Sequence, residues 1–497
     1  MTPTSALPGD AAPRPELSTW QRIAYGLGDV FGGGAGVLLS VTYLFFLTSI
    51  VRIEPVLAGS ILLISRVYDA ITDPLEGVLA DRTRTPLGRR RPYLLAGIPL
   101  IVIALTLLYY PVAFESQAGR FVFVLVAYLL FSTVSSIVLL NYNALHSELT
   151  LDYNERTSLS SIRIAFSTFS SLVVAVVPLW MVDQFQNPRT GYLVMGVTFG
   201  LIFALPYIAT VTALRERPEF QGEPKPFNFR ETFIEPLRIK TYAVLLIMYL
   251  SAFVAIDVVL AITQYYITYY MGRGGTATSA VLGVLLIFQA ISVLLYFQLS
   301  KRTSKRVGYM VGAAIWIVTM TFSLALTPQQ PAWFIYVFAA FVGLGTGGVV
   351  VMTYSMFPDI PDVDELQSGQ RREGVFASLQ TFMRKLAAGL ALFMVGLAID
   401  LAGFIEPIEQ TVDGVTTLIN QPQSDTFTFV IRLVFALVPI VFLTIGLLAA
   451  SRYPLDQPTH ARLKGVLDVR RDRREEDEAI QQEAAALKQL LVRREGA

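Results

Sequence analysis

The chain has 497 residues, of which 54% are hydrophobic and 15% are charged, with a formal net charge of +1. These shares are too apolar for a typical soluble domain and predict an all-α membrane protein with several spans. The chain has no cysteine, which excludes disulfides and cysteine-ligated metals, and its two histidines argue against a His-based metal or haem centre. We expect no organic cofactor and no nucleic-acid partner.

Apolar runs of about 20 residues are long enough to cross the hydrocarbon core of a bilayer. Twelve such runs are predicted to be spans: 24–50, 56–80, 93–114, 120–145, 160–182, 190–214, 241–270, 277–299, 307–327, 332–357, 374–402 and 426–450. The predicted organisation is a disordered N-terminus (1–19), two six-helix bundles (20–214 and 241–451) joined by a polar linker (215–240), and a charged tail (452–497).

Basic residues gather in the loops after spans 2, 6 and 8, while the intervening loops hold few of them. The positive-inside rule therefore predicts that both termini are cytoplasmic, here in a bacterial inner membrane. We expect a monomer. The tail segment Leu467–Arg494 predicts one charged helix with a modest apolar face, which is either a solvated helix or a regulatory element.

The strongest functional signal lies in span 2, where Asp69 and Asp73 stand four residues apart and so share one helix face. A carboxylate at mid-bilayer costs roughly 2.5–3.5 kcal/mol, so a pair of them needs a partner. Hard cations take oxygen ligands, and Thr72 adds a hydroxyl beside the pair. We therefore predict a Na⁺ or H⁺ site, with an internal salt bridge from Arg66 as the alternative.

Other spans also carry ionisable residues, which are functional candidates because they are costly in lipid. Asp29 in span 1 and Asp257 in span 7 are either functional or paired with a neighbouring base. Arg163 lies in span 5, and Lys385 lies in span 11 beside Arg384, which we expect on the lipid or packing side.

The loop after span 2 combines a glycine, an acidic–basic pair and a basic cluster: Gly77, Asp81, Arg82, Arg89 and Arg90. These arginines predict a latch that pairs with Asp81, or simple topogenic charge. The order G-x-x-x-D-R followed by G-R-R-R resembles the cytoplasmic signature of the major facilitator superfamily. The loop after span 8 resembles a weaker repeat of it.

Four further motifs carry a more specific resemblance: Y-G-L-G-D (25–29), R-V-Y-D-A-I-T-D-P (66–74), N-E-R-T-S-L-S-S-I-R (154–163) and R-R-E-G-V-F-A-S-L-Q-T-F-M-R-K (371–385). They resemble the glycoside–pentoside–hexuronide:cation symporters, and the similarity runs through most of the range 21–403. This resemblance implies a cation site of Asp69, Asp73, Thr72 and Ser136, and substrate-binding residues Arg163, Lys385, Thr381 and Gln380. We add Asp29 to the predicted substrate-binding residues as an ionisable residue within a span.

Two departures from that family bear on the substrate. Gly33 and Leu139 stand where melibiose permease has acidic residues that bind sugar hydroxyls. Arg163 and Lys385 then lack carboxylate partners, which favours a solute that bears a carboxylate or phosphate. The sodium-dependent lysophospholipid symporters are relatives of this family with a similar cation motif.

We therefore expect a Na⁺- or H⁺-coupled symporter of a sugar, glycoside or hexuronide that works by alternating access. A lysophospholipid or other anionic or zwitterionic amphiphile is the alternative substrate. An uncoupled facilitator, a lipid scramblase and a transporter-like receptor are the other functional classes. Neither the spans nor the loops show a nucleophile–base pair or phosphate-binding loop, so we do not expect an enzyme.

Overall fold

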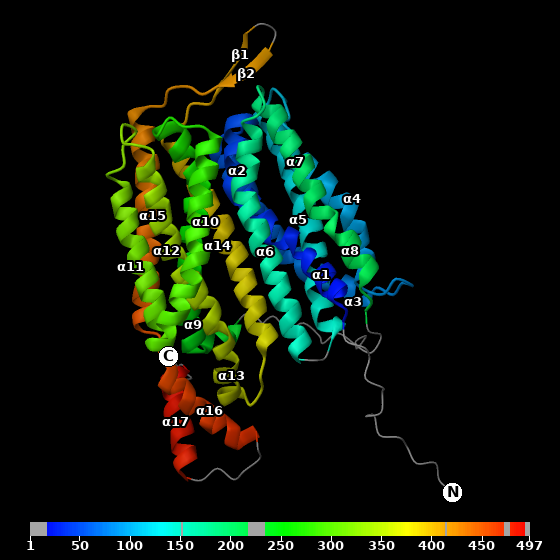
Figure 1. Cartoon of the computed structure of the whole chain (residues 1–497), viewed down its shortest axis with the longest axis vertical. Helices are drawn as coiled ribbons and strands as arrows, with labels where there is room; N and C mark the ends of the chain where they lie inside the picture. The colour runs from blue at the N-terminus through cyan, green and yellow to red at the C-terminus, as the bar shows by residue number, and fades with distance from the viewer. Residues whose placement is uncertain (1–16, 151–152, 217–233, 413–414, 472–477, 493–497) are drawn as a thin grey trace.

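The computed structural model describes residues 17–150, 153–216, 234–412, 415–471 and 478–492. Within these residues, twelve helices are long and apolar enough to cross a membrane, and each overlaps one predicted span. Figure 1 shows them as a bundle of long helices, with a β-hairpin at one end and two short helices at the other. The prediction of an all-α membrane fold with twelve spans is confirmed, and the β-hairpin is an addition to it.

The N-terminal half comprises α1 (Thr19–Leu27), α2 (Asp29–Phe45), η1 (Phe46–Ile50), α3 (Pro55–Arg82), α4 (Arg91–Leu108), α5 (Gln117–Leu149), α6 (Tyr153–Val182), α7 (Pro188–Ala204) and α8 (Pro206–Ala213). The C-terminal half comprises η4 (Pro236–Arg238), α9 (Lys240–Tyr265), η5 (Tyr266–Tyr270), α10 (Gly275–Arg302), α11 (Lys305–Ser323), α12 (Trp333–Met356), η6 (Phe357–Asp359), α13 (Ile360–Ser368), α14 (Glu373–Leu401), β1 (Ile408–Val412), β2 (Val415–Ile419) and α15 (Asp425–Ser451). The tail forms α16 (Gln457–Arg471) and α17 (Glu478–Leu491).

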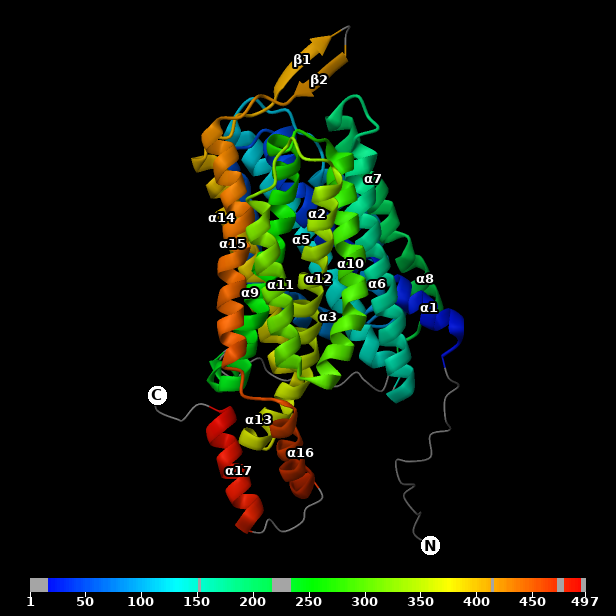
Figure 2. The ribbon, with the colours of Figure 1, turned by 60° about the vertical axis from the view of Figure 1, so that its left-hand side comes forward.

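The hairpin marks one end of the bundle and the tail helices mark the other, as Figure 2 shows, and we call these the hairpin end and the tail end. In the hairpin, β1 pairs with β2 in antiparallel register, with Ile408 opposite Ile419. The sequence places Asp-Gly directly after Val412, and this dipeptide favours two-residue hairpin turns. That signal could have predicted the hairpin.

The two halves repeat one local device at the hairpin end. The first span ends in the π-helix η1 and the seventh span ends in the π-helix η5, each five residues long. Each is followed within two residues by a positive φ, at Arg52 (62°) and at Gly272 (64°). π-Helices are rare, so their occurrence at matched positions indicates that the two halves are internal repeats.

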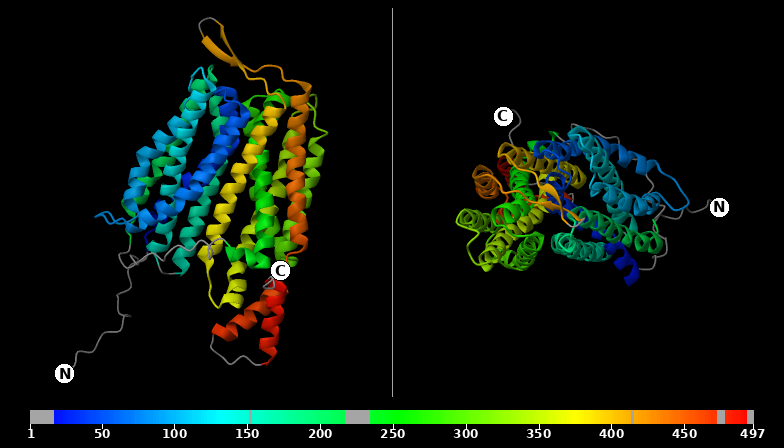
Figure 3. Two further views of the ribbon diagram at one scale, coloured as in Figure 1. Left: turned by 180° about the vertical axis from the view of Figure 1, so that it is seen from behind. Right: turned by 90° about the horizontal axis from the view of Figure 1, so that it is seen from above.

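The halves meet closely at the hairpin end. The hydroxyls of Thr48 and Tyr265 lie 2.5 Å apart, and those of Ser49 and Tyr269 lie 3.1 Å apart. Asp183, after α6, accepts hydrogen bonds from the backbone and hydroxyl of Thr276 in the first turn of α10, at 2.6 and 2.7 Å. Across the halves, α14 packs against α3, α2 packs against α9 and α10 packs against α6, and Figure 3 shows the two halves side by side from behind and from above.

The tail departs from its prediction, because two helices stand where we expected one over Leu467–Arg494. Their buried side chains, including Leu463 and Leu487, pack under α13 and form a small core. Asp362 of α13 accepts hydrogen bonds from Arg371 at 2.6 Å and from Arg471 of α16 at 3.4 Å. The tail is therefore fastened to the connector that leads into α14.

The loop between α3 and α4 is held by a carboxylate from the start of the linker. Glu216 accepts hydrogen bonds from the backbone N–H groups of Arg89, Arg90 and Arg91 at 2.5, 2.7 and 2.9 Å, and so caps the N-terminus of α4. Gly88 has φ +106°, and a Cβ there would lie 2.7 Å from the Glu216 carboxylate. The glycine is therefore required by both the backbone angle and the close approach.

Replacing Glu216 with alanine should lower the free energy of unfolding by about 1–3 kcal/mol, because several helix N–H groups lose their acceptor. The measurement is thermal unfolding of the detergent-purified protein. Glu216→Gln is the matched control, and it should lose less because it keeps one acceptor oxygen. Equal unfolding temperatures for Glu216→Ala and the wild type would contradict the capping role.

Candidate functional site

Helix α3 carries both predicted cation-site carboxylates to the middle of the molecule. Asp69 is 1% exposed and Asp73 is half-buried. Two of the contacts of Asp69 come from its own half: Arg66 donates to Oδ2 at 3.2 Å, and Ser132 of α5 donates a short hydrogen bond to Oδ1. The salt bridge that we considered as an alternative is thus present, and it uses only one of the two aspartates.

Lys385 of α14 lies against both aspartates from the other half of the protein. Its Nζ is 2.6 Å from Oδ2 of Asp73, 3.5 Å from Oδ2 of Asp69 and 3.4 Å from the hydroxyl of Ser136. The structure therefore brings together three predicted cation-site residues and one predicted substrate-site residue. The ammonium lies where a cation that neutralises the pair would also lie.

Arg163 also has a carboxylate partner. Its Nε lies 3.1 Å from Oδ2 of Asp29, and its guanidinium stacks 5.2 Å from the ring centre of Tyr142. Our expectation that Arg163 and Lys385 lack carboxylate company is therefore wrong, because their partners lie on helices distant in sequence. Asp29 retains a second carboxylate oxygen, Oδ1, that is buried and has no hydrogen-bond partner among the described residues.

The packing around Gly33 leaves no room for an acidic residue at this position. A Cβ at this position would lie 2.4 Å from the backbone oxygen of Ser167 in α6. The departure from the sugar-binding pattern at Gly33 thus follows from the close contact of α2 and α6.

Arg384 does not face lipid. It donates two hydrogen bonds to Asp257 of α9, at 2.6 and 2.8 Å, and lies 4.8 Å from the ring centre of Phe253. This corrects the lipid-facing part of our expectation for Arg384 and gives Asp257 the base partner that we considered. The pair joins α9 to α14 within the C-terminal half.

The side-chain hydroxyls of Thr72 and Thr381 bond the backbone of their own helices. Thr72 donates to the backbone oxygen of Tyr68 at 3.1 Å, and Thr381 donates to that of Ala377 at 2.9 Å. Thr381 is exposed and Gln380 is half-buried, both on the part of α14 that leads from Lys385 to the tail end. No contact of Gln380 or Thr381 with the charged cluster is described.

Two groups near the aspartates are not among the predicted site residues, although the spacing of Glu76 already places it on the same side of the helix as the pair. Ser132 lies one turn before Ser136 on α5, a spacing that the sequence already shows. Glu76 follows Asp73 by three residues on α3, and its Oε2 is buried without a hydrogen-bond partner in the described part of the chain. Oδ1 of Asp73 is in the same situation. Two buried carboxylate oxygens thus remain open to a further ligand.

The basic cluster after α3 forms a latch within the N-terminal half. Arg89 and Arg90 lie 2.5 and 3.2 Å from the same oxygen of Glu148, at the end of α5. Lys305 and Asp359, 2.6 Å apart, occupy the corresponding positions in the other half. The side chain of Asp81 lies outside the described residues, so the predicted pairing with it stays a prediction. Gly77 packs near Leu140, and Arg82 is exposed.

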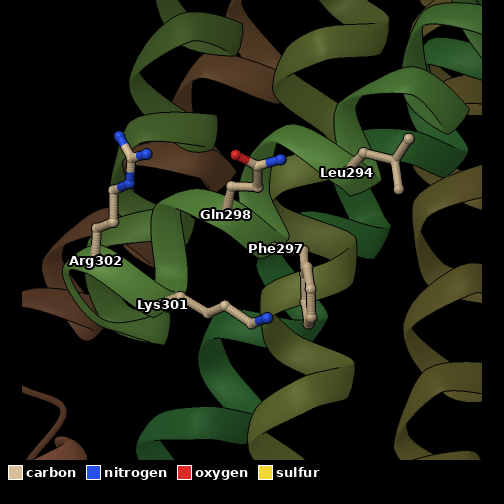
Figure 4. Close-up of a pocket in the computed structure, with 5 residues that line it drawn as sticks. All are labelled: Leu294, Phe297, Gln298, Lys301 and Arg302. Carbon is tan, nitrogen blue, oxygen red and sulfur yellow. The ribbon is translucent and has the colours of Figure 1, made fainter.

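A cavity of about 420 Å³ lies apart from these groups, on the tail-end portion of α10. Figure 4 shows its five lining residues, all from this one helix, and Lys301 lies 4.1 Å from the ring centre of Phe297. Its lining residues include no carboxylate, and none of them comes from the N-terminal half. It is a surface groove rather than a site between the halves.

Two six-helix halves with paired charges at mid-span define an integral multi-pass membrane transporter. The sequence matches the family described as MFS/sugar transport protein over residues 24–457, and the chain belongs to this family. In fold, the chain is similar to a D-xylose-proton symporter structure, with a TM-score of 0.61 and 15% identity over 87% of this chain and 96% of that one.

Several curated relatives are symporters or sugar transporters by name. An uncharacterized symporter of Synechocystis is 27% identical, over 90% of this chain and 96% of the relative. A sodium-dependent lysophosphatidylcholine symporter of Danio rerio is 24% identical, over 91% and 88%. An isoprimeverose transporter of Lactiplantibacillus pentosus is 24% identical, over 88% and 89%.

Proposed function

We propose that this protein is a cation-coupled symporter that moves a small organic solute by alternating access of its two halves. The observation that carries the proposal is the position of Lys385, whose ammonium lies 2.6 Å from Asp73 and 3.5 Å from Asp69. An ammonium from one half thus pairs with two carboxylates of the other half at mid-span. A coupling ion would take over that role, and the symporters among the relatives support this class of mechanism.

The proposed ion is Na⁺ or H⁺, held by Asp69 and Asp73. Hydroxyl oxygens from Ser136 and Thr72 complete a set of oxygen ligands, which hard cations prefer. The open oxygens of Asp73 and Glu76 support this placement, because a buried carboxylate oxygen without a partner is destabilising and a cation relieves it.

Lys385 and the coupling ion compete for the same carboxylates in this mechanism. When the ion binds, the ammonium is released from Asp73 and turns to the space between the halves. A solute that carries a negative group then binds the freed ammonium. Ion and solute thus stabilise one state together, and each raises the affinity for the other, typically by 1–3 kcal/mol.

A sugar, glycoside or hexuronide is the proposed solute class, and a hexuronide fits best because it offers hydroxyls and one carboxylate. Gln380 and Thr381 lie on the same helix as Lys385 and can bond sugar hydroxyls. A lysophospholipid is the second candidate, since its phosphate could bind the same ammonium and one relative is named for such a substrate. An uncoupled facilitator and a transporter-like receptor are the remaining alternatives.

We further propose that the tail end faces the cytoplasm. The basic loop after α3, the start of the linker and the loop before Lys305 all lie at that end, together with the tail helices. The positive-inside rule then places both termini in the cytoplasm of a bacterial inner membrane.

The deciding experiment is uptake of D-glucuronate, D-xylose and lysophosphatidylcholine into proteoliposomes with an imposed Na⁺ or H⁺ gradient. We expect Asp69→Asn and Asp73→Asn each to reduce gradient-driven accumulation at least tenfold, because each removes half of the ion site. Lys301→Ala, which changes a basic residue outside the site, is the matched control. Accumulation that still follows the gradient in both aspartate variants would sink the ion assignment.

The remaining functional classes are separated by the same assay. Equilibration without accumulation in the wild type would instead indicate a facilitator. Unchanged uptake after removal of 456–497 would count against a receptor that signals through the tail.

A further inference from the structure

A second cavity lies at the hairpin end, far along the helices from Asp69 and Asp73. Its volume is about 240 Å³, and it is lined by residues from both halves of the protein. The N-terminal half supplies Ser49 and Tyr192, and the C-terminal half supplies Gln264 and Thr268, with Asn420 from the end of the hairpin. We call this space the outer cavity.

Gln264 lines the outer cavity and carries an unused acceptor. The residue is 4% exposed, and its amide nitrogen donates to the hydroxyl of Tyr192 at 3.3 Å. Its amide oxygen is buried and has no hydrogen-bond partner among the described residues. An acceptor left without a partner destabilises the folded protein, and a hydroxyl donor from a ligand would relieve that cost.

The charge of the lining selects the kind of ligand. Asp183 is the one formally charged residue among the described lining residues, and no lysine, arginine or histidine is present there. One oxygen of Asp183 is already bound to Thr276. An anionic solute would be repelled, whereas a neutral solute with several hydroxyls would find acceptors and the aromatic faces of Phe45 and Tyr192.

We propose that the outer cavity binds one neutral, polyhydroxylated ring of about the size of a pentose, with the oxygen of Gln264 as an acceptor. A water molecule occupies about 30 Å³ in the liquid, so 240 Å³ corresponds to about eight waters or one such ring. Because the cavity exists only where the two halves meet, an occupant stabilises the state in which the hairpin end is closed. This site lies apart from the proposed ion and solute site.

The absence of native cysteine allows a direct occupancy assay. Asn420 lines the cavity and is exposed, so Asn420→Cys should react with a charged methanethiosulfonate reagent. We expect D-xylose to slow this labelling at least fivefold. The sugar is added at up to about 100 mM, so that a site with a millimolar dissociation constant is saturated. D-glucuronate, a ring that carries a carboxylate, should slow it much less.

Two further substitutions test whether D-xylose protects the introduced thiol at position 420 by binding in the outer cavity or at the proposed solute site. Gln264→Met in the Asn420→Cys background should abolish protection, and Lys385→Ala in the same background should leave it intact. If D-xylose does not slow the labelling of the Asn420→Cys protein, the proposal is overturned. This measurement keeps Gln264 unchanged, so it does not depend on whether the Gln264→Met variant folds. Protection that survives Gln264→Met, or that is lost in Lys385→Ala, also overturns it. None of these outcomes bears on ion-driven uptake, so this proposal and the proposed function can fail separately.

Discussion

Replacing Lys385 with alanine is expected to tighten Na⁺ binding and to remove the dependence of solute binding on the ion. In the structure, the ammonium lies 2.6 Å from Asp73. At an effective dielectric constant of 20, this attraction is about 6 kcal/mol before desolvation is subtracted. Without the lysine, Arg66 still pairs with Asp69, but Asp73 loses the ammonium that competes with the ion. We expect the affinity for Na⁺ to rise tenfold or more and solute affinity to fall at least as much.

The measurement is thermal stabilisation of the purified protein by Na⁺, with and without the solute identified by the uptake assay. Lys385→Arg keeps the charge and should behave more like the wild type. Lys301→Ala should bind Na⁺ as the wild type does. Unchanged Na⁺ affinity in Lys385→Ala would show that the lysine does not compete with the ion.

A disulfide between positions 183 and 275 is expected to stop transport by holding the hairpin end closed. A Cβ built on Gly275 lies 3.3 Å from Cγ of Asp183, which is close to the separation that a disulfide requires. We expect oxidation of the Asp183→Cys, Gly275→Cys double variant to lower uptake at least tenfold. Alternating access needs this end to open, and the bond joins one half to the other.

The chain has no cysteine of its own, so each single-cysteine variant is a clean control for oxidation and for loss of the Asp183 cap. Dithiothreitol should restore uptake, and loss of free thiols should report the extent of cross-linking. A fully cross-linked protein that transports at the uncross-linked rate would show that the hairpin end does not need to open.

Features of the site that arise within a single helix can be predicted from the sequence. The spacing of Asp69 and Asp73 places them on one face of α3, and the length of the apolar runs predicts the twelve spans. Both follow from local geometry that every α-helix shares.

Contacts between distant segments could not be predicted in this way. Lys385 and Asp73 are 312 residues apart in the sequence, and their pairing depends on how α14 packs against α3. The same reason explains why Arg163 and Arg384 were assigned no specific carboxylate partner. Gly389 and Gly396 of α14 show what permits this packing, since a Cβ at either position would clash with α3.

The pairing of Lys385 with the aspartates has an electrical consequence. The ammonium and the carboxylates stay on the protein, so any charge that they carry across in the loaded step returns in the empty step, and they add no net current over a full cycle. With one Na⁺ and a neutral solute, each cycle moves one elementary charge, and the membrane potential then contributes about 2.3 kcal/mol per 100 mV. With a monoanionic solute, the charges cancel and voltage no longer drives uptake. The current that accompanies transport thus reports the charge of the solute.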